Sequence, residues 1–157
     1  MQRRIAIVVG LAAFMAVTTA ALAQSADPLV GTWTLNVAKS KYSPGPAPKS
    51  STVKIEGTDK ARKVTVDVTP ATGAVQHWEA SGPTGPDVPI TGNNPNADTY
   101  VFKRVNATTL EAQYKKSGKP TIKQTAVVSA DGKTLTVTGT GTNAQGQAVN
   151  NVAVYDR

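Results

Sequence analysis

From residue 31 onward, apolar and polar residues alternate along the chain in a series of short segments. Val64, Val66 and Val68, for example, alternate with charged and hydroxyl side chains. Alternation of period two in β-branched residues is typical of antiparallel strands with one buried face. The pattern predicts nine strands, which lie within 32–37, 52–55, 63–69, 74–80, 99–105, 109–115, 121–129, 134–140 and 148–155.

Short polar turns separate most of these segments. Asp131-Gly132, for example, lies between two alternating segments and is a strong hairpin signal. Short connections make neighbours in sequence neighbours in space, so we expect an up-and-down meander. A long meander with one apolar face must curl and close, because otherwise it exposes that face and its edges. We therefore predict an all-β fold, a single antiparallel up-and-down barrel of eight or nine strands, with a β-sandwich as the alternative.

The first 23 residues have the pattern of a cleavable secretory signal peptide. Arg3 and Arg4 give a basic start, an uncharged and mostly apolar stretch follows, and Ala21-Leu22-Ala23 forms a cleavage site. An uncleaved membrane anchor is the alternative interpretation. We expect 1–23 to be the signal peptide, 24–30 a lead-in and 31–157 the barrel domain. The predicted location is the periplasm or outside the cell, with no membrane span after cleavage.

Composition narrows the chemistry that the exported chain can perform. The sequence contains no cysteine, which excludes thiol nucleophiles and thiolate metal sites. The formal net charge of +7 falls to +5 when Arg3 and Arg4 are removed, and most of the positive charge is lysine spread singly along the chain. We interpret it as a solvated basic surface; weak attraction to anionic lipid or glycan is the alternative.

The first strand begins with Gly31-Thr32-Trp33 and is followed by a long loop. This resembles the Gly-x-Trp signature of lipocalins and related calycin barrels. The resemblance implies an eight-stranded barrel in which Trp33 closes one end, with a basic residue of the last strand packed across it; Arg157 matches by position. Most of the chain past the signal peptide, including the segments 31–49, 89–99, 131–138 and 150–155, also resembles a family of small exported bacterial proteins of unestablished function.

The same resemblance suggests which residues surround a ligand. In lipocalin-like barrels the loop after the first strand lies over the open end, so we expect 38–49 to act as a lid with Tyr42 at the mouth. The lysines Lys39, Lys41 and Lys49 would then be placed to meet a ligand carboxylate. The residues predicted to bind ligand are Trp33, Tyr42, His77, Trp78, Tyr100, Phe102 and Tyr114.

The remaining candidate chemistry is weak. His77 is the only histidine, and alternation places it on the opposite face of its strand from Trp78. A serine triad or an imidazole metal site needs further partners, and the chain has no G-x-S-x-G or H-E-x-x-H motif. Asn94, Asn96 and Asp98 have the spacing that begins a calcium loop, but the downstream glutamate is missing, and ordinary turn chemistry explains them equally well. We therefore expect no catalytic residue, metal or cofactor.

The sequence leaves three functions open. The leading hypothesis is non-catalytic binding of a small apolar or amphipathic ligand inside the barrel. The second is a structural or protein-interaction module of the cell envelope, and the third is an exported hydrolase, which would lack a recognisable nucleophile and base. Aromatic residues beside Lys103 and Arg104 could in principle stack on bases, but export argues against a nucleic-acid partner.

Overall fold

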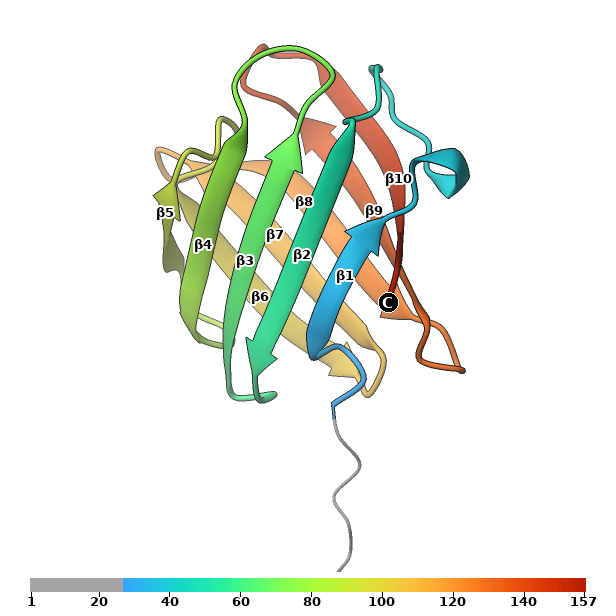
Figure 1. Cartoon of the computed structure of the whole chain (residues 1–157). Helices are drawn as coiled ribbons and strands as arrows, with labels where there is room; N and C mark the ends of the chain where they lie inside the picture. Colours follow the sequence, from blue (N-terminus) through green and yellow to red (C-terminus); the bar gives the residue numbers. More distant parts are fainter. Residues whose placement is uncertain (1–26) are drawn as a thin grey trace, which may run out of the picture.

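Ten antiparallel strands form one closed barrel in the computed structural model, which describes residues 27–157 (Figure 1). The strands are β1 (Gly31–Leu35), β2 (Ser50–Gly57), β3 (Ala61–Thr69), β4 (Gln76–Pro83), β5 (Val88–Gly92), β6 (Thr99–Asn106), β7 (Thr109–Lys116), β8 (Lys119–Val128), β9 (Thr134–Thr142) and β10 (Ala148–Asp156). Each strand pairs with the next one along the chain, and β1 pairs with β10 to close the barrel. This confirms the predicted up-and-down barrel and rejects the β-sandwich. Residues 1–23, the predicted signal peptide, and residues 24–26 lie outside the described residues.

The barrel has ten strands, and the prediction of eight or nine is wrong. The additional strand is β5, which lies between the predicted strands 74–80 and 99–105, where the sequence predicts no strand. Pro89 cannot donate a backbone hydrogen bond and Gly92 weakens a strand, so both residues hide β5 from pattern analysis. β5 pairs with β6 at only two positions, Val88 with Tyr100 and Pro89 with Thr99. Val88 is nevertheless fully buried, so β5 completes the wall between β4 and β6.

Antiparallel pairing divides the connections between the two ends of the barrel. The turns 58–60, 84–87, 107–108 and 129–133 lie at the end where the described chain begins and ends, which we call the closed end (Figure 1). The connections 36–49, 70–75, 93–98, 117–118 and 143–147 lie at the opposite end, which we call the loop end.

Trp33 and Arg157 seal the closed end together. Trp33 is fully buried, and its indole Nε1 donates a hydrogen bond to the carbonyl oxygen of Leu29 at 3.0 Å. The Arg157 guanidinium lies 4.3 Å from the centroid of the Trp33 ring, and its Nη2 donates to the carbonyl oxygens of Pro28 and Val30. The expected contact of Arg157 with Trp33 is confirmed. Gly31 allows this close approach, because a Cβ there would lie 3.0 Å from Arg157 Nη2.

The long loop 36–49 runs beside β10 at the loop end. It begins with one turn of 3-10 helix, η1 (Val37–Lys39), and the Asn36 side chain caps that turn by accepting a hydrogen bond from the backbone N–H of Lys39. Lys41 and Val152 then exchange two backbone hydrogen bonds of 2.7 and 2.8 Å. These bonds fasten the middle of the loop to the barrel. No helix within residues 27–157 is long and apolar enough to cross a membrane.

Candidate functional site

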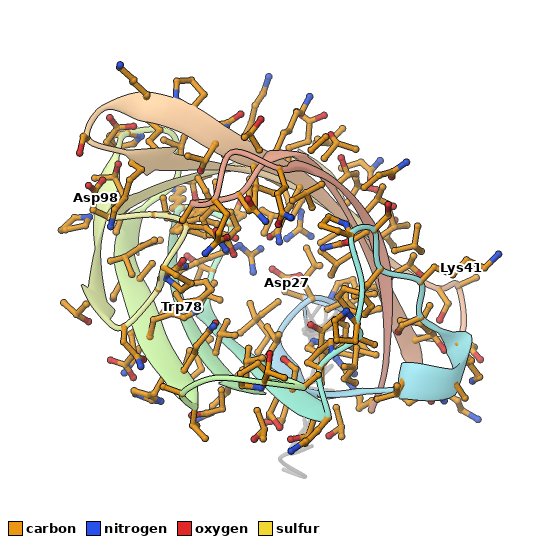
Figure 2. The ribbon with its side chains drawn as sticks, turned by 90° about the horizontal axis from the view of Figure 1, so that it is seen from above. Asp27, Lys41, Trp78 and Asp98 are labelled. Atoms are coloured by element: carbon orange, nitrogen blue, oxygen red, sulfur yellow. The ribbon has the colours of Figure 1, made fainter. Side chains whose placement is uncertain are left out.

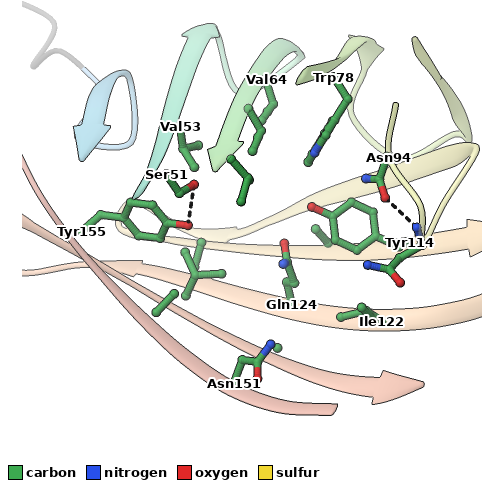
Figure 3. Close-up of a pocket in the computed structure, with 18 of the residues that line it drawn as sticks. Ser51, Val53, Val64, Trp78, Asn94, Tyr114, Ile122, Gln124, Asn151 and Tyr155 are labelled. Atoms are coloured by element: carbon green, nitrogen blue, oxygen red, sulfur yellow. Dashed lines mark hydrogen bonds between the residues drawn. The ribbon is translucent and has the colours of Figure 1, made fainter. Parts of the chain in front are cut away.

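A cavity of about 230 Å³ lies inside the barrel, between the residues that seal the closed end and the connections of the loop end (Figure 3). Aliphatic side chains on inward-facing strand positions form much of its wall, among them Val53, Ile55, Val64, Val66, Leu110 and Ile122. Ala112, Ala126, Gly139 and Ala153 also line it. A barrel of about this size can be filled by its own side chains. These small residues on β7 to β10 do not fill it, so space remains along the barrel axis.

Three aromatic rings form one side of the cavity. Trp78 on β4, Tyr100 on β6 and Tyr114 on β7 all line it. The centroid of Trp78 lies 6.1 Å from that of Tyr100 and 5.7 Å from that of Tyr114, with both pairs in edge-on orientations. The two tyrosine centroids are 4.9 Å apart. Edge-on and offset contacts of this kind hold aromatic rings in fixed orientations, so this wall is a rigid surface.

The polar groups that reach the cavity are hydroxyls and amides. Ser51 Oγ and the phenol oxygen of Tyr155 lie 3.5 Å apart in its wall, and Gln124 and Asn151 also line it (Figure 3). Burial raises the pKa of the Tyr155 phenol, and it raises the pKa of the Tyr114 phenol well above its usual value. These phenols therefore remain neutral and can donate or accept hydrogen bonds at physiological pH.

Loop residues surround the cavity at the loop end. Tyr42 and Pro48 come from the loop 36–49, and Asn94 and Asn96 come from the connection between β5 and β6. The Asn94 side chain accepts a hydrogen bond from the backbone N–H of Asn96 at 2.9 Å, and the Asn96 side chain accepts one from Ala144 at 2.9 Å. The first bond lies within the connection 93–98, and the second links it to the connection 143–147, so side-chain to backbone bonds hold this part of the rim in place.

The calcium interpretation of Asn94, Asn96 and Asp98 gains no support from these contacts. The two asparagine oxygens bond the backbone as described above, and Asp98 Oδ2 accepts a hydrogen bond from the backbone N–H of Ser117 at 2.8 Å. Each of the three side chains therefore accepts a hydrogen bond from a different backbone N–H. Among residues 27–157, no cluster of three or more His, Cys, Asp or Glu side chains is arranged to hold a metal ion.

The structure brings together four of the seven side chains that the sequence predicts at the ligand site. Tyr42, Trp78, Tyr100 and Tyr114 line the cavity. Trp33 and Phe102 are fully buried but are not among the residues that line it. Trp33 instead closes the barrel beneath the cavity, and Phe102 packs against Tyr100 with ring centroids 5.3 Å apart.

His77 does not line the cavity, because its side chain lies on the outer face of β4. It is 58% exposed, and its Nδ1 lies 2.7 Å from Oδ1 of Asp67, which is equally exposed on the neighbouring strand β3. Strand alternation explains the difference from Trp78: adjacent residues on a strand point to opposite faces. An exposed pair of this kind contributes little to stability.

Sequence reasoning missed several polar residues of the cavity. Ser51, Gln76, Gln124, Asn151 and Tyr155 all line it. Their position along the strands could have indicated that they face the interior. Each lies two residues from another inward-facing residue of the same strand, as Gln76 does from Trp78. A polar side chain in an inward-facing row of a small barrel marks either a ligand contact or an internal hydrogen bond.

A second buried polar group lies at the closed end. The Asp27 carboxylate bonds the Arg62 Nη2, the Arg104 Nη1 at 2.7 Å and the backbone N–H of Leu29 at 3.0 Å. Figure 2 looks down through the barrel and shows Asp27 near the centre of its floor. The Arg62 side chain is completely buried, and its Nε and Nη1 have no hydrogen-bond partner among residues 27–157.

The pKa of Asp27 reflects this arrangement. Burial alone would raise the pKa of the Asp27 carboxyl, but hydrogen bonds from Arg104, Leu29 and Arg62 together lower it. Asp27 therefore remains ionised and neutralises one of two nearby arginines. This group holds the start of the described chain across the floor of the barrel, beneath the cavity.

Comparison with known proteins gives no further guide to the site. No protein-family model matches the chain, and no curated protein matches it.

Proposed function

We propose that this protein is a non-catalytic binding protein that holds one small apolar or amphipathic molecule inside its barrel. The observation that carries the proposal is the cavity of about 230 Å³, with a largely aliphatic and aromatic wall and a few hydroxyl and amide groups. Apolar walls with a small number of placed polar groups are typical of small-molecule sites. The floor is sealed by Trp33 and Asp27, so the ligand enters from the loop end.

A lipocalin-like, calycin-type relationship is part of the proposal. It is supported by Gly31-Thr32-Trp33 on the first strand of an up-and-down barrel and by Arg157 packed over the Trp33 ring. The ten strands depart from the eight that the resemblance implies. The proposed relationship therefore rests on the closed end, where Pro28, Val30 and Gly31 lie against Arg157.

We further propose that the protein acts in the periplasm or outside the cell, after removal of residues 1–23. The support is the order of basic, apolar and small residues in that segment. N-terminal sequencing of the exported protein should then begin at or near Gln24. Recovery of the chain with Met1 in the membrane fraction would contradict export by cleavage and favour an anchor.

Native mass spectrometry tests the binding function directly. Protein purified from the producing cell without denaturation should carry one additional mass per barrel, and that mass should disappear after unfolding and refolding. A matched variant, Ala112→Phe, should lose the additional mass because the larger ring fills the cavity. Wild-type protein without any retained mass, which also binds no small molecule from a solvent and metabolite panel, would contradict the proposal and favour a structural module.

A further inference from the structure

The cavity is built without charged side chains. Among the described residues, no Asp, Glu, Lys, Arg or His lines it. The lysines that the sequence places near a ligand carboxylate do not reach it: Lys39 pairs with Asp156 outside the barrel at 3.4 Å, and neither Lys41 nor Lys49 is among the lining residues. Arg62 is a buried cation, but it bonds Asp27 at the floor and does not line the cavity. A charged ligand would therefore lose its hydration without meeting an opposite charge.

Several hydrogen-bond donors that line the cavity bond no other side chain or backbone group within residues 27–157, and the indole N–H of Trp78 is one of them. The indole of Trp78 is 95% buried, and Figure 3 shows its nitrogen turned into the cavity, with the phenol oxygen of Tyr114 facing the same region. Trp33 offers a contrast, because its indole N–H bonds the carbonyl of Leu29. Buried indole N–H groups usually find an acceptor, so the Trp78 N–H is positioned to bond an acceptor atom of a ligand.

The size of the cavity limits what can occupy it. An apolar cavity of about 150 Å³ accommodates benzene, which corresponds to about 25 Å³ for each non-hydrogen atom. By that scale a cavity of about 230 Å³ accommodates about nine such atoms. The rigid surface of Trp78, Tyr100 and Tyr114 offers faces and edges against which a flat ring can pack.

We propose that the ligand is an uncharged, compact molecule of about nine non-hydrogen atoms, with a carbonyl, ether or hydroxyl oxygen that accepts the Trp78 indole N–H. This inference rests on the proposed binding function and specifies the class of ligand. It assigns Trp78 the role of the specificity-determining donor. The neighbouring amide of Gln124 and hydroxyl of Tyr114 offer further neutral hydrogen bonds to the same ligand.

Three probes of matched size and shape test the inference: acetophenone, α-methylstyrene and benzoate. They share a phenyl ring and the same number of non-hydrogen atoms. Acetophenone carries a neutral hydrogen-bond acceptor, α-methylstyrene carries no acceptor, and benzoate carries a negative charge. Titrations followed by NMR should show saturable binding of acetophenone with a Kd about three- to tenfold lower than that of α-methylstyrene, the range expected for one net hydrogen bond. Benzoate should bind more weakly than both.

The wild-type protein also supplies a direct readout of the proposed bond. The indole N–H resonance of Trp78 should shift downfield on addition of acetophenone and remain in place on addition of α-methylstyrene. In Trp78→Phe, the preference for acetophenone over α-methylstyrene should disappear. His77→Gln is the matched control, since it changes the adjacent, outward-facing residue of β4 and should retain the preference.

The outcomes separate this inference from the binding function on which it rests. Benzoate binding as tightly as acetophenone would overturn the uncharged class and leave the carrier function standing. Equal affinity for acetophenone and α-methylstyrene, with an unchanged Trp78 indole resonance, would contradict the proposed hydrogen bond from Trp78 to an acceptor atom of the ligand. If none of the probes binds but the native protein retains a larger molecule, the size class is wrong; if none binds and nothing is retained, the binding function fails as well.

Discussion

At the closed end of the barrel, Trp33 and Arg157 depend on each other for their positions. The indole is fully buried and hydrogen-bonded, while the guanidinium covers its face and bonds two carbonyl oxygens of the segment that precedes β1. This contact joins the first described residues of the chain to the last. Closure of the barrel floor therefore depends on these two side chains.

Trp33→Ala should be among the most damaging single substitutions in this chain. Truncation of a buried aromatic residue lowers the free energy of unfolding by about 3–5 kcal/mol, a large part of the stability of a small domain. Arg157→Ala should lower it by about 1–2 kcal/mol, because it removes one cation–π contact and its hydrogen bonds. Denaturant titration measures both values. An unchanged midpoint for Trp33→Ala would show that the closed end does not depend on this ring.

The charged side chains of Asp27, Arg62 and Arg104 at the closed end should also contribute to the stability of the barrel. Asp27→Asn should lower the free energy of unfolding by about 3–5 kcal/mol, because it leaves the buried Arg62 without its counter-charge. The double variant Asp27→Asn/Arg62→Met should be less destabilised than Asp27→Asn, since it also removes the uncompensated buried charge. Chemical denaturation of both variants compares them. A double variant less stable than the single one would show that Arg62 is needed for reasons other than its charge.

At the scale of elements, the rim of the cavity is formed by connections and not by strands. The loop 36–49 is fastened to β10 by the exchange of hydrogen bonds between Lys41 and Val152, which places Tyr42 and Pro48 beside the cavity. This arrangement makes the loop part of the rim, while the expected role of 38–49 as a lid stays a prediction. It also shows why its lysines are unavailable to a ligand: Lys41 lies in the fastened stretch and is exposed.

Tyr42→Ala should accelerate exchange of a bound molecule, because it removes a large ring from the rim. The dissociation rate of acetophenone, obtained from NMR line shapes, should rise several-fold, since changes in affinity within one site act mainly through the dissociation rate. Lys41→Ala is the matched control in the same stretch of loop, and it should leave the rate unchanged. Equal rates in wild type and Tyr42→Ala would place the entrance elsewhere.

For the whole molecule, ionisation of acids and phenols limits the pH range of stability. Hydrogen bonds and nearby cations lower the pKa of several carboxyls, which are those of Asp27, Glu79, Asp131 and Asp156. The unfolded chain therefore binds protons more tightly at these groups. Their stabilisation is complete above the unfolded pKa values of about 4 and is lost as the pH falls through the lower folded values.

Buried phenols limit the stability of the protein at high pH. Burial raises the pKa of Tyr42, Tyr100, Tyr114 and Tyr155. Their contribution is complete below the unfolded pKa of about 10 and is lost as the pH rises towards the folded values. The free energy of unfolding should therefore be nearly constant between about pH 5 and pH 9 and fall on both sides. Urea titrations across this range measure it, and stability that increases above pH 10 would contradict the assignment of buried neutral phenols.

Much of the barrel can be predicted from the chain because strand alternation is a local property. The alternation correctly places Trp78 and His77 on opposite faces of β4, and the short turns correctly imply pairing of sequential strands. It fails at β5, where Pro89 and Gly92 interrupt the local signal while β4 and β6 supply the partners that make a strand. Gly92 itself is required there, because a Cβ would lie 2.2 Å from the His77 carbonyl oxygen.

The buried face of most strands and the residues that begin and close the barrel can be predicted from the chain, because both follow from neighbours in sequence or from a local motif. How far along the barrel axis each inward residue lies is set by the folded barrel. Tyr100 and Phe102 are two residues apart on one face of β6, yet Tyr100 lines the cavity and Phe102 does not. That depth depends on strand register and on contacts between distant segments, such as Asp27 with Arg62 and Arg104, which no local pattern encodes.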